Sequence, residues 1–101
     1  MIKHTVLFKF KEESKNQVYR AREILLSMEG IVPTVQKVEV AIDELNSARS
    51  FDIMLTVTLE DFNALDEYQK DPYHVNVVKT FMQDHTSQSV TMDYTVRNLD
   101  K

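Results

Sequence analysis

Three residues of this sequence carry side chains suited to moving protons: Tyr68, His74 and His4. Tyr68 and His74 stand six residues apart, on either side of the pair Asp71-Pro72. Because Asp accepts backbone N–H groups at a helix N-cap and Pro suits the first helical position, a new helix is predicted to begin there. His74 then falls in its first turn, and Tyr68 falls in the last turn of the preceding helix. A phenol and an imidazole are therefore expected to face each other across a kink.

This pair predicts a particular kind of chemistry. The first turn of a helix presents free N–H groups and a partial positive charge, which favours a neutral imidazole at His74. A neutral imidazole can take a proton from a carbon next to a carbonyl group. The Tyr68 hydroxyl would donate a hydrogen bond to the carbonyl or enolate oxygen, where charge develops. His4 would bind a polar group of the substrate, so the site is predicted to need neither a metal nor a cofactor.

The same residues have a structural interpretation, which stays open beside the catalytic one. His74 and Tyr68 would then only lock the kink between two helices, with the tyrosine as an amphipathic core residue. His4 would be a half-buried strand residue. The third histidine, His85, is assigned to a solvated loop, and the three histidines lack the spacing of metal ligands. Whether the protein is an enzyme is not decided by these residues.

Length and composition describe one folded domain, residues 1–101. The formal charge of −4 opposes nonspecific binding to nucleic acid or to anionic membranes. The chain has no cysteine, so disulfides and thiolate metal sites are excluded. The N-terminus runs straight into a strand pattern without a signal-peptide stretch, and no segment approaches transmembrane length. A cytoplasmic protein is the resulting expectation.

The elements that must position the site follow from periodicity. Apolar residues and His4 alternate with lysines along residues 2–11, which predicts a strand with one buried face. Ser14 and Gln17 form a capping box and Gly30 suits a C-cap, so a helix is expected over about 14–29. The further predicted elements are a strand opened by Pro33, a loop at 43–50, a strand at 51–59, helices starting at Asp61 and Asp71, a loop at 84–88 and a strand from Val90 to Val96. Phe62, Leu65, Val75, Val78 and Met82 are expected on the buried helix stripes.

This order, βαββαβ, predicts an α+β protein of ferredoxin-like type: a four-stranded antiparallel sheet with helices on one face. The other face carries Thr5, Leu7, Met54 and Thr56, which are not strongly polar. A second copy packed sheet to sheet would cover them. We therefore expect a homodimer that closes a barrel with the helices outside.

Three segments resemble the stress-responsive A/B barrel (Dabb) family over nearly the whole chain: the opening Ile2–Lys11, the segment Asp71–Val75 and the closing Val90–Tyr94. The resemblance implies a dimeric α+β barrel built from two ferredoxin-like protomers. Most members are soluble proteins of unknown activity, often linked to stress responses. One branch contains olivetolic acid cyclase, a cofactor-free enzyme that closes a linear polyketide by aldol condensation.

The resemblance to that branch assigns roles to particular residues. Tyr68 and His74 match the catalytic tyrosine and histidine of the cyclase, and His4 matches a pocket histidine. Ile53 stands where the cyclase has a further pocket histidine, and Asn76 and Val78 stand where it has small glycines, which implies a smaller and less polar pocket. The substrate-binding residues predicted in addition to His4 are Val6, Phe8, Ile53, Leu55 and Val78.

The predicted function is that of a small dimeric Dabb protein that binds a small organic molecule in a cleft between helices and sheet. Cofactor-free proton transfer by His74 and Tyr68 is the catalytic form of this hypothesis. Two alternatives stay open: a stress-associated structural protein without a substrate, and a cofactor-free monooxygenase of the same barrel fold. The monooxygenase alternative rests on analogy of fold alone.

Overall fold

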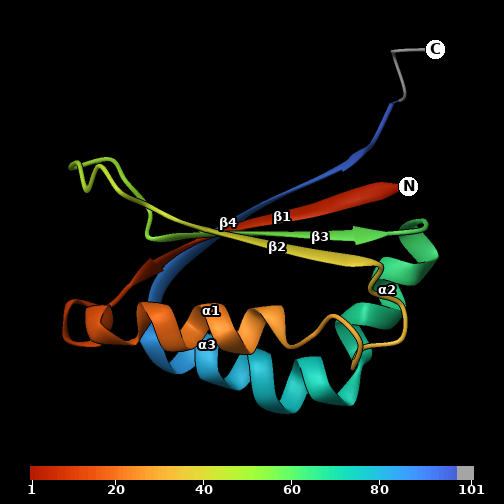
Figure 1. The fold of residues 1–101 in the computed structure, drawn as a ribbon, viewed down its shortest axis with the longest axis horizontal. Coiled ribbons are helices and arrows are strands. Elements are labelled where there is room, and N and C mark those ends of the chain that lie inside the picture. Colours follow the sequence, from red (N-terminus) through yellow and green to blue (C-terminus); the bar gives the residue numbers. More distant parts are fainter. Residues whose placement is uncertain (98–101) are drawn as a thin grey trace.

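A twisted antiparallel sheet lies on one side of the molecule and all the helices on the other (Figure 1). The computed structural model describes residues 1–97. Its strands are β1 (Ile2–Phe10), β2 (Lys37–Ile42), β3 (Ile53–Leu59) and β4 (Thr86–Thr95), in the order β2-β3-β1-β4. The predicted ferredoxin-like protomer with a four-stranded antiparallel sheet is thus confirmed. No helix in the described part of the chain is long and apolar enough to cross a membrane.

The alternation in β1 has the predicted phase. Ile2, His4, Val6 and Phe10 are buried against the helices, whereas Phe8 is half-buried. Side chains alternate between the two faces of a strand, so the lysines of β1 lie on the opposite face or at its margins. His4 is thus held inside the protein by its apolar neighbours on the same strand.

The first helical segment departs from the prediction. It begins as a 3₁₀ helix, η1 (Glu12–Gln17), and continues as α1 (Val18–Leu26). The predicted capping box is wrong, because no side chain caps either helix and Ser14 is buried inside η1. The Ser14 hydroxyl instead meets His85 Nδ1 at 2.8 Å. Ser14 thus bonds to a residue distant in the sequence instead of capping the helix locally. Sequence spacing alone does not reveal this partner.

Gly30 comes four residues after the end of α1, at φ +93°. Glycine adopts this left-handed conformation without a steric penalty, so the chain can turn here toward the sheet. The next strand does not open at Pro33, as predicted, but at Lys37. Val32 and Val35 are buried along the connection, so this segment belongs to the hydrophobic core although it forms neither strand nor helix.

The two predicted aspartate caps are confirmed. Asp61 accepts a hydrogen bond from Ala64 N at 2.8 Å and starts α2 (Phe62–Lys70). Asp71 accepts from Tyr73 N at 2.8 Å and starts the next helical segment. That segment contains a π-helical turn, η2 (His74–Lys79), and ends as α3 (Thr80–His85).

Other details of the second helical layer differ from the prediction. Phe62 is 52% exposed and Val75 is 37% exposed, so neither belongs to a buried stripe. The π-helical turn accounts for Val75, because a wider turn shifts which residues of a helix share a face. The predicted loop at 84–88 is absent, since α3 runs to His85 and β4 begins at Thr86.

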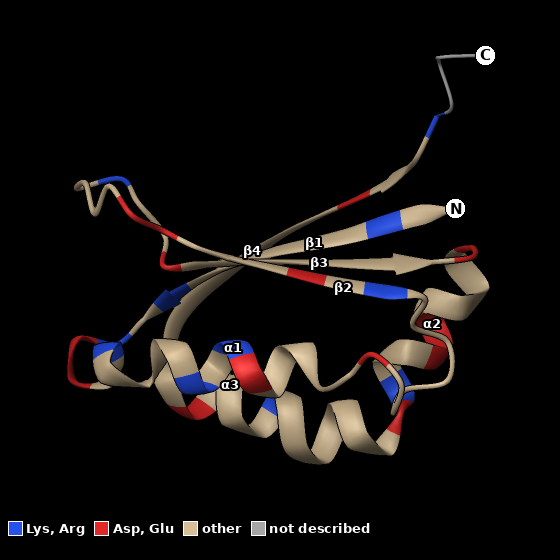
Figure 2. Cartoon of the chain, viewed as in Figure 1, with Lys and Arg blue, Asp and Glu red and all other residues tan. Residues whose placement is uncertain are grey.

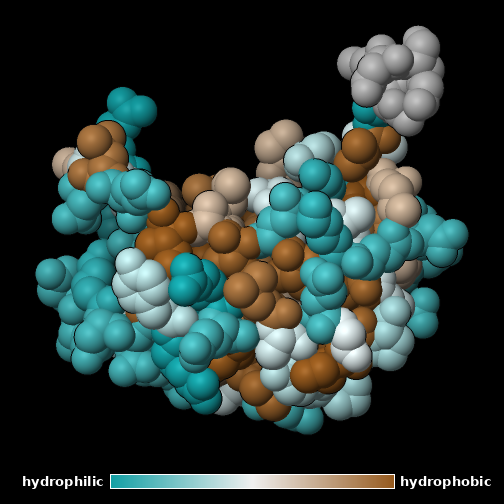
Figure 3. All heavy atoms as spheres, viewed as in Figure 1, coloured by the Kyte–Doolittle hydropathy of each residue, from teal (hydrophilic) through white to brown (hydrophobic). Residues whose placement is uncertain are grey.

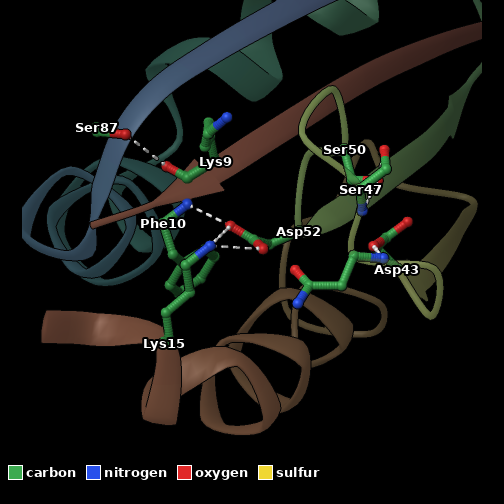
Figure 4. Close-up of polar contacts among 9 residues, drawn as sticks. Lys9, Phe10, Lys15, Asp43, Ser47, Ser50, Asp52 and Ser87 are labelled. Atoms are coloured by element: carbon green, nitrogen blue, oxygen red, sulfur yellow. Dashed lines mark hydrogen bonds and ion pairs between the residues drawn. The ribbon is translucent and has the colours of Figure 1, made fainter. Parts of the chain in front are cut away.

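A small polar cluster ties three elements together where β1 ends (Figure 4). Asp52 N donates to Phe8 O at 2.8 Å, and Asp52 Oδ2 accepts from Phe10 N at 2.7 Å. Lys15 Nζ of η1 lies 3.0 Å from both carboxylate oxygens. The Asp52 side chain thus extends the strand pairing beyond β3 and anchors the start of the first helical segment.

The edge strand β4 turns its apolar residues away from the helices. Its register with β1 places Asp93 beside His4 and Thr91 beside Val6, on the helix side of the sheet. The intervening residues therefore lie on the helix-free face. These are Val90 (42% exposed), Met92 (65%) and Tyr94 (40%). Figure 2 shows few charged residues on the central strands, and Figure 3 shows apolar atoms where the outline is hollowed between the β2–β3 loop and the far end of β4.

Candidate functional site

A cavity of about 210 Å³ lies between the helices and the sheet. We call it the cleft. Seven of the eight residues predicted for the site line it: His4, Val6, Phe8, Leu55, Tyr68, His74 and Val78. Ile53 does not line the cleft, and its side chain is 1% exposed within the core. The structure therefore brings the three candidate proton-handling side chains to one place.

The Tyr68 ring lies between the two histidine rings. Its centroid is 4.3 Å from that of His74, with an angle of 37° between the planes. On the other side, the His4 ring approaches at 5.7 Å in an edge arrangement with an angle of 63°. Such arrangements are favourable for aromatic rings. The three residues form a continuous aromatic wall that crosses from β1 to the second helical layer.

His74 owes its position to the break between α2 and η2. The carboxylate of Asp71 accepts a hydrogen bond from His74 N at 3.2 Å, so the backbone is held at the first turn. His74 is also the first residue of the π-helical turn, an irregularity often found at functional sites. The local sequence signals at Asp71 and Pro72 thus place this imidazole at the cleft.

The environment keeps the His74 imidazole neutral. Burial lowers the pKa of His74 below its usual value, and the charges of Lys79 and His4 lower it further. The nearby backbone of Gln69 and the charge of Asp71 act in the opposite direction. The direction agrees with the sequence argument, but the largest cause is burial rather than the helix terminus. The Nδ1 atom of His74 is buried and has no hydrogen-bond partner among the described residues.

His4 has a partner that sequence analysis missed. Its Nδ1 atom lies 2.5 Å from Asp93 Oδ1 on the neighbouring strand. A carboxylate only accepts hydrogen bonds, so His4 Nδ1 carries a proton and the ring orientation is fixed. In the neutral ring, Nε2 then remains as an acceptor. Only the register of β4 against β1 reveals this pair, because 89 residues separate the two positions.

The Tyr68 hydroxyl is engaged with the core in this structure. It donates to Met28 Sδ at 3.6 Å, and Tyr68 is 1% exposed. Burial raises the pKa of Tyr68, so the phenol stays protonated at neutral pH. The ring of Tyr68 contributes to the cleft, while its hydroxyl is bound to a sulfur of the helical layer.

Several residues of the cleft were not foreseen from sequence. They come from α1, from the second helical layer and from the helix side of β4: Leu25, Gln69, Lys79, Met82, Gln83, Thr86, Ser89 and Thr91. The alternation in β4 was recognised, but only its apolar half was considered. A loop was predicted where Thr86 starts the strand. Ser89 therefore fell outside the predicted strand, and Thr91, although inside it, was assigned to neither face.

Residues 1–97 contain no candidate metal site, because no three His, Asp or Glu side chains gather closely enough to hold a metal ion. The polar groups of the cleft are imidazoles, one ammonium, amides and hydroxyls. This set suits hydrogen bonding and proton transfer with an organic molecule.

The order of elements, the sheet order and the cleft define a ferredoxin-like α+β protein with an aromatic, histidine-containing site. The profile of the family described as the stress responsive A/B barrel domain, Dabb, matches residues 2–96. The chain therefore belongs to the Dabb family.

Solved structures share this fold. An Arabidopsis thaliana protein has a TM-score of 0.84 at 18% identity and covers 98% of both chains. A dimeric protein of unknown function with a ferredoxin-like fold, from Bacteroides fragilis, has a TM-score of 0.81 at 22% identity over 94% of this chain and 95% of that chain. Hydroxynitrile lyase from Passiflora edulis has a TM-score of 0.80 at 16% identity over 95% of this chain and 93% of that chain. At such identities the similarity shows the fold alone. No curated protein sequence matches the chain significantly.

Proposed function

We propose that this Dabb protein is a homodimer that binds a small organic molecule in the cleft and uses His74 as a proton acceptor. The observation that carries the proposal is that His74 lines the cavity together with Tyr68 and His4, while burial lowers the pKa of its imidazole. A hydrogen bond between a ligand and this imidazole would contribute to binding.

The proposed chemistry uses the neutral state of His74. A neutral imidazole accepts a proton near pH 7, and a lowered pKa keeps the acceptor form available. His4, oriented by Asp93, would hold a polar group of the ligand through Nε2. The Tyr68 ring packs against both imidazoles and helps to hold them in the cleft. For Tyr68 to act on a substrate oxygen, as the resemblance to the cyclase implies, its hydroxyl would have to leave Met28.

The homodimer is supported by the helix-free face of the sheet. Val90, Met92 and Tyr94 add to the four residues expected there from sequence, and Met54 is 41% exposed beside them. Exposed apolar surface of this extent typically marks an interface. Solved relatives are described as dimeric ferredoxin-like proteins. Two copies packed face to face would leave the cleft of each protomer open on the outer, helical side.

One observation favours a second function, that of a structural protein without a substrate. The Tyr68 hydroxyl satisfies a core contact, as it would if the tyrosine served only to pack the helices on the sheet. In that case the cleft would hold only water. The two functions differ in whether His74 contributes to binding.

Fragment screening by ligand-observed NMR separates these functions. The wild-type protein is expected to bind small carbonyl or hydroxyl compounds in the cleft, and His74→Ala should weaken that binding by about 1–3 kcal/mol. Tyr68→Phe should have a smaller effect. Asn76→Ala is the matched control, because Asn76 is exposed on the same π-helical turn and does not line the cleft. Equal binding by the His74 and Asn76 variants, or no binding at all, would contradict the proposed binding function and favour the structural one.

A further inference from the structure

The charge of the cleft is opposite to the charge of the protein. The chain carries 16 acidic and 12 basic residues, a formal net charge of −4. Among the described residues that line the cleft, however, Lys79 is the one permanently charged side chain, and no carboxylate is present. Asp93 does not line the cleft, and its carboxylate is hydrogen-bonded to the His4 ring. The cleft is thus a locally positive cavity in an acidic protein.

Lys79 is available to a ligand. It is the last residue of η2, and its side chain lines the cleft near His74. The ion pairs formed within residues 1–97 use the lysines at positions 3, 15, 37 and 70, and Lys79 is not among them. The charge of Lys79 acts instead on His74, where it lowers the pKa of the imidazole. The ammonium group therefore acts on the imidazole of the cleft and forms no ion pair with a carboxylate within residues 1–97.

The remaining lining divides into a polar and an apolar part. Hydroxyl and amide groups come from β4 and from the second helical layer, at Ser89, Thr91, Gln69 and Gln83, whereas the Thr86 hydroxyl already donates to Met82 O. The apolar part consists of side chains from β1, β3, α1 and the second helical layer: Val6, Phe8, Leu25, Leu55, Val78 and Met82. Hydroxyl and amide N–H groups donate to anionic oxygens, and an ammonium adds a charge-assisted bond. A ligand with one anionic group on an apolar body would match both parts.

We propose that the cleft selects a small organic carboxylate, with Lys79 as the residue that binds its carboxylate group. This inference rests on the proposed function, because it names the class of molecule that occupies the same cleft. The hydroxyl groups of Ser89 and Thr91 complete the carboxylate site, and the apolar body lies against Phe8 and Leu55. Lys79 is a specificity residue in this arrangement, whereas His74 acts on the bound molecule.

The size of the cleft limits the ligand further. Its volume of about 210 Å³ lies below the ~300–1,000 Å³ typical of sites for drug-sized molecules. At a share of ~30 Å³ for each water molecule, it would hold roughly seven waters. A single aromatic ring or a chain of about six carbons with a carboxylate is the size class that fits.

Two matched pairs of probes test the inference: benzoate with benzamide, and hexanoate with hexanamide. Each pair keeps the apolar body and changes the anionic group to a neutral one. Wild-type affinities are measured at low and at high salt by ¹H–¹⁵N chemical-shift titration. We expect the carboxylates to bind roughly tenfold tighter than the amides at low salt, and the difference to shrink as salt screens the charge.

The decisive variant is Lys79→Gln, which keeps a donor but removes the charge. It should reduce the preference for carboxylates to about twofold or less and leave amide binding nearly unchanged. Lys70→Gln is the control, since it removes the same charge from an exposed lysine that pairs with Asp66 and does not line the cleft. Unaltered discrimination in Lys79→Gln, or equal wild-type affinity for both members of a pair, overturns the carboxylate inference while binding in the cleft stands. If none of the four probes shifts the cleft resonances and His74→Ala also changes nothing, the proposed function itself fails.

Discussion

The two faces of the sheet have opposite relations to water. On the helix side, β4 contributes Ser89, Thr91 and Asp93, which are polar although the protein's own helices pack on that face. On the helix-free side, the same strand contributes Val90 and Met92, which are apolar although no element within residues 1–97 covers them. An edge strand that merely closed a monomeric core would carry the reverse pattern.

This difference agrees with the two roles proposed for the faces of the sheet. The helix side accepts polar groups at its margin because the helices leave a cleft there, where hydroxyls and imidazoles can meet a ligand. The helix-free side offers apolar area, which is stabilised when a second sheet covers it. The alternation of a single strand thus contributes to the proposed ligand site on one face and to the proposed dimer interface on the other.

The largest effect is expected on the helix-free face, which is the proposed dimer interface. Met54→Asp would place one unpaired charge from each protomer in a symmetric interface. Burying such charges costs several kcal/mol, so the dimer should weaken by roughly 4 kcal/mol or more, about a thousandfold in Kd. Light scattering and analytical ultracentrifugation at micromolar concentration measure this change.

The control for that experiment is Phe62→Asp. Phe62 is an exposed apolar residue of the helical layer, and an acidic residue is tolerated in the first turn of α2. This variant should remain dimeric. A wild-type protein that is monomeric at micromolar concentration would contradict the assignment of the helix-free face.

The next largest effect is the difference in stability cost between removing a core phenylalanine and removing a phenylalanine of the cleft, both on the helix-covered face of the sheet. Phe10 is 2% exposed, whereas Phe8 is half-buried and lines the cleft. Phe10→Ala should lower the free energy of unfolding by about 3–5 kcal/mol, and Phe8→Ala should cost clearly less because it enlarges an existing cavity. Urea unfolding at one fixed protomer concentration compares the two. Equal or reversed costs would mean that Phe8 belongs to the packed core.

A smaller effect tests the contact that replaced the predicted capping box. Ser14→Ala should cost about 1–2 kcal/mol, because His85 Nδ1 loses its partner. A double-mutant cycle with His85→Ala isolates the pair and should give a coupling free energy of about 1 kcal/mol. Additive costs would restore a purely local role for Ser14 at the helix start.

The smallest effect is a protonation equilibrium in the cleft. NMR titration of the wild-type protein should place the pKa of His74 below its usual value of 6.5, since burial disfavours the imidazolium. The unfolded chain then binds more protons than the native protein, so the stability tied to His74 is present above pH 6.5 and is lost as the pH falls from there through the lowered native pKa. His74→Ala should lose less stability than the wild type over this range. A midpoint above 6.5 would show that the Gln69 backbone and the charge of Asp71, rather than burial, control the imidazole.

Local signals in the sequence were enough for the elements and for part of the site. Alternation placed β1 and β3 in the correct phase, and Asp61 and Asp71 were recognised as helix caps. The spacing of Tyr68 and His74 around the Asp71 cap predicted their contact. These features act within one turn or one strand, so neighbouring residues determine them.

The contacts between distant segments were decided only by the tertiary structure. The partnership of Ser14 with His85, of His4 with Asp93, and of the Tyr68 hydroxyl with Met28 each joins residues at least 40 positions apart. Several acceptors compete for each of these groups, and packing selects among them.

The sequence by itself therefore determined the βαββαβ order, the helix-covered face and the meeting of a phenol with an imidazole. The tertiary structure decided which half of the β4 alternation faces the cleft, and with it the placing of Asp93, Ser89 and Thr91. The physical reason is that a strand's alternation is intrinsic, whereas its register is set by the partner strand. A shift of one residue would exchange the two faces of β4, moving its polar residues out of the cleft and its apolar residues into it.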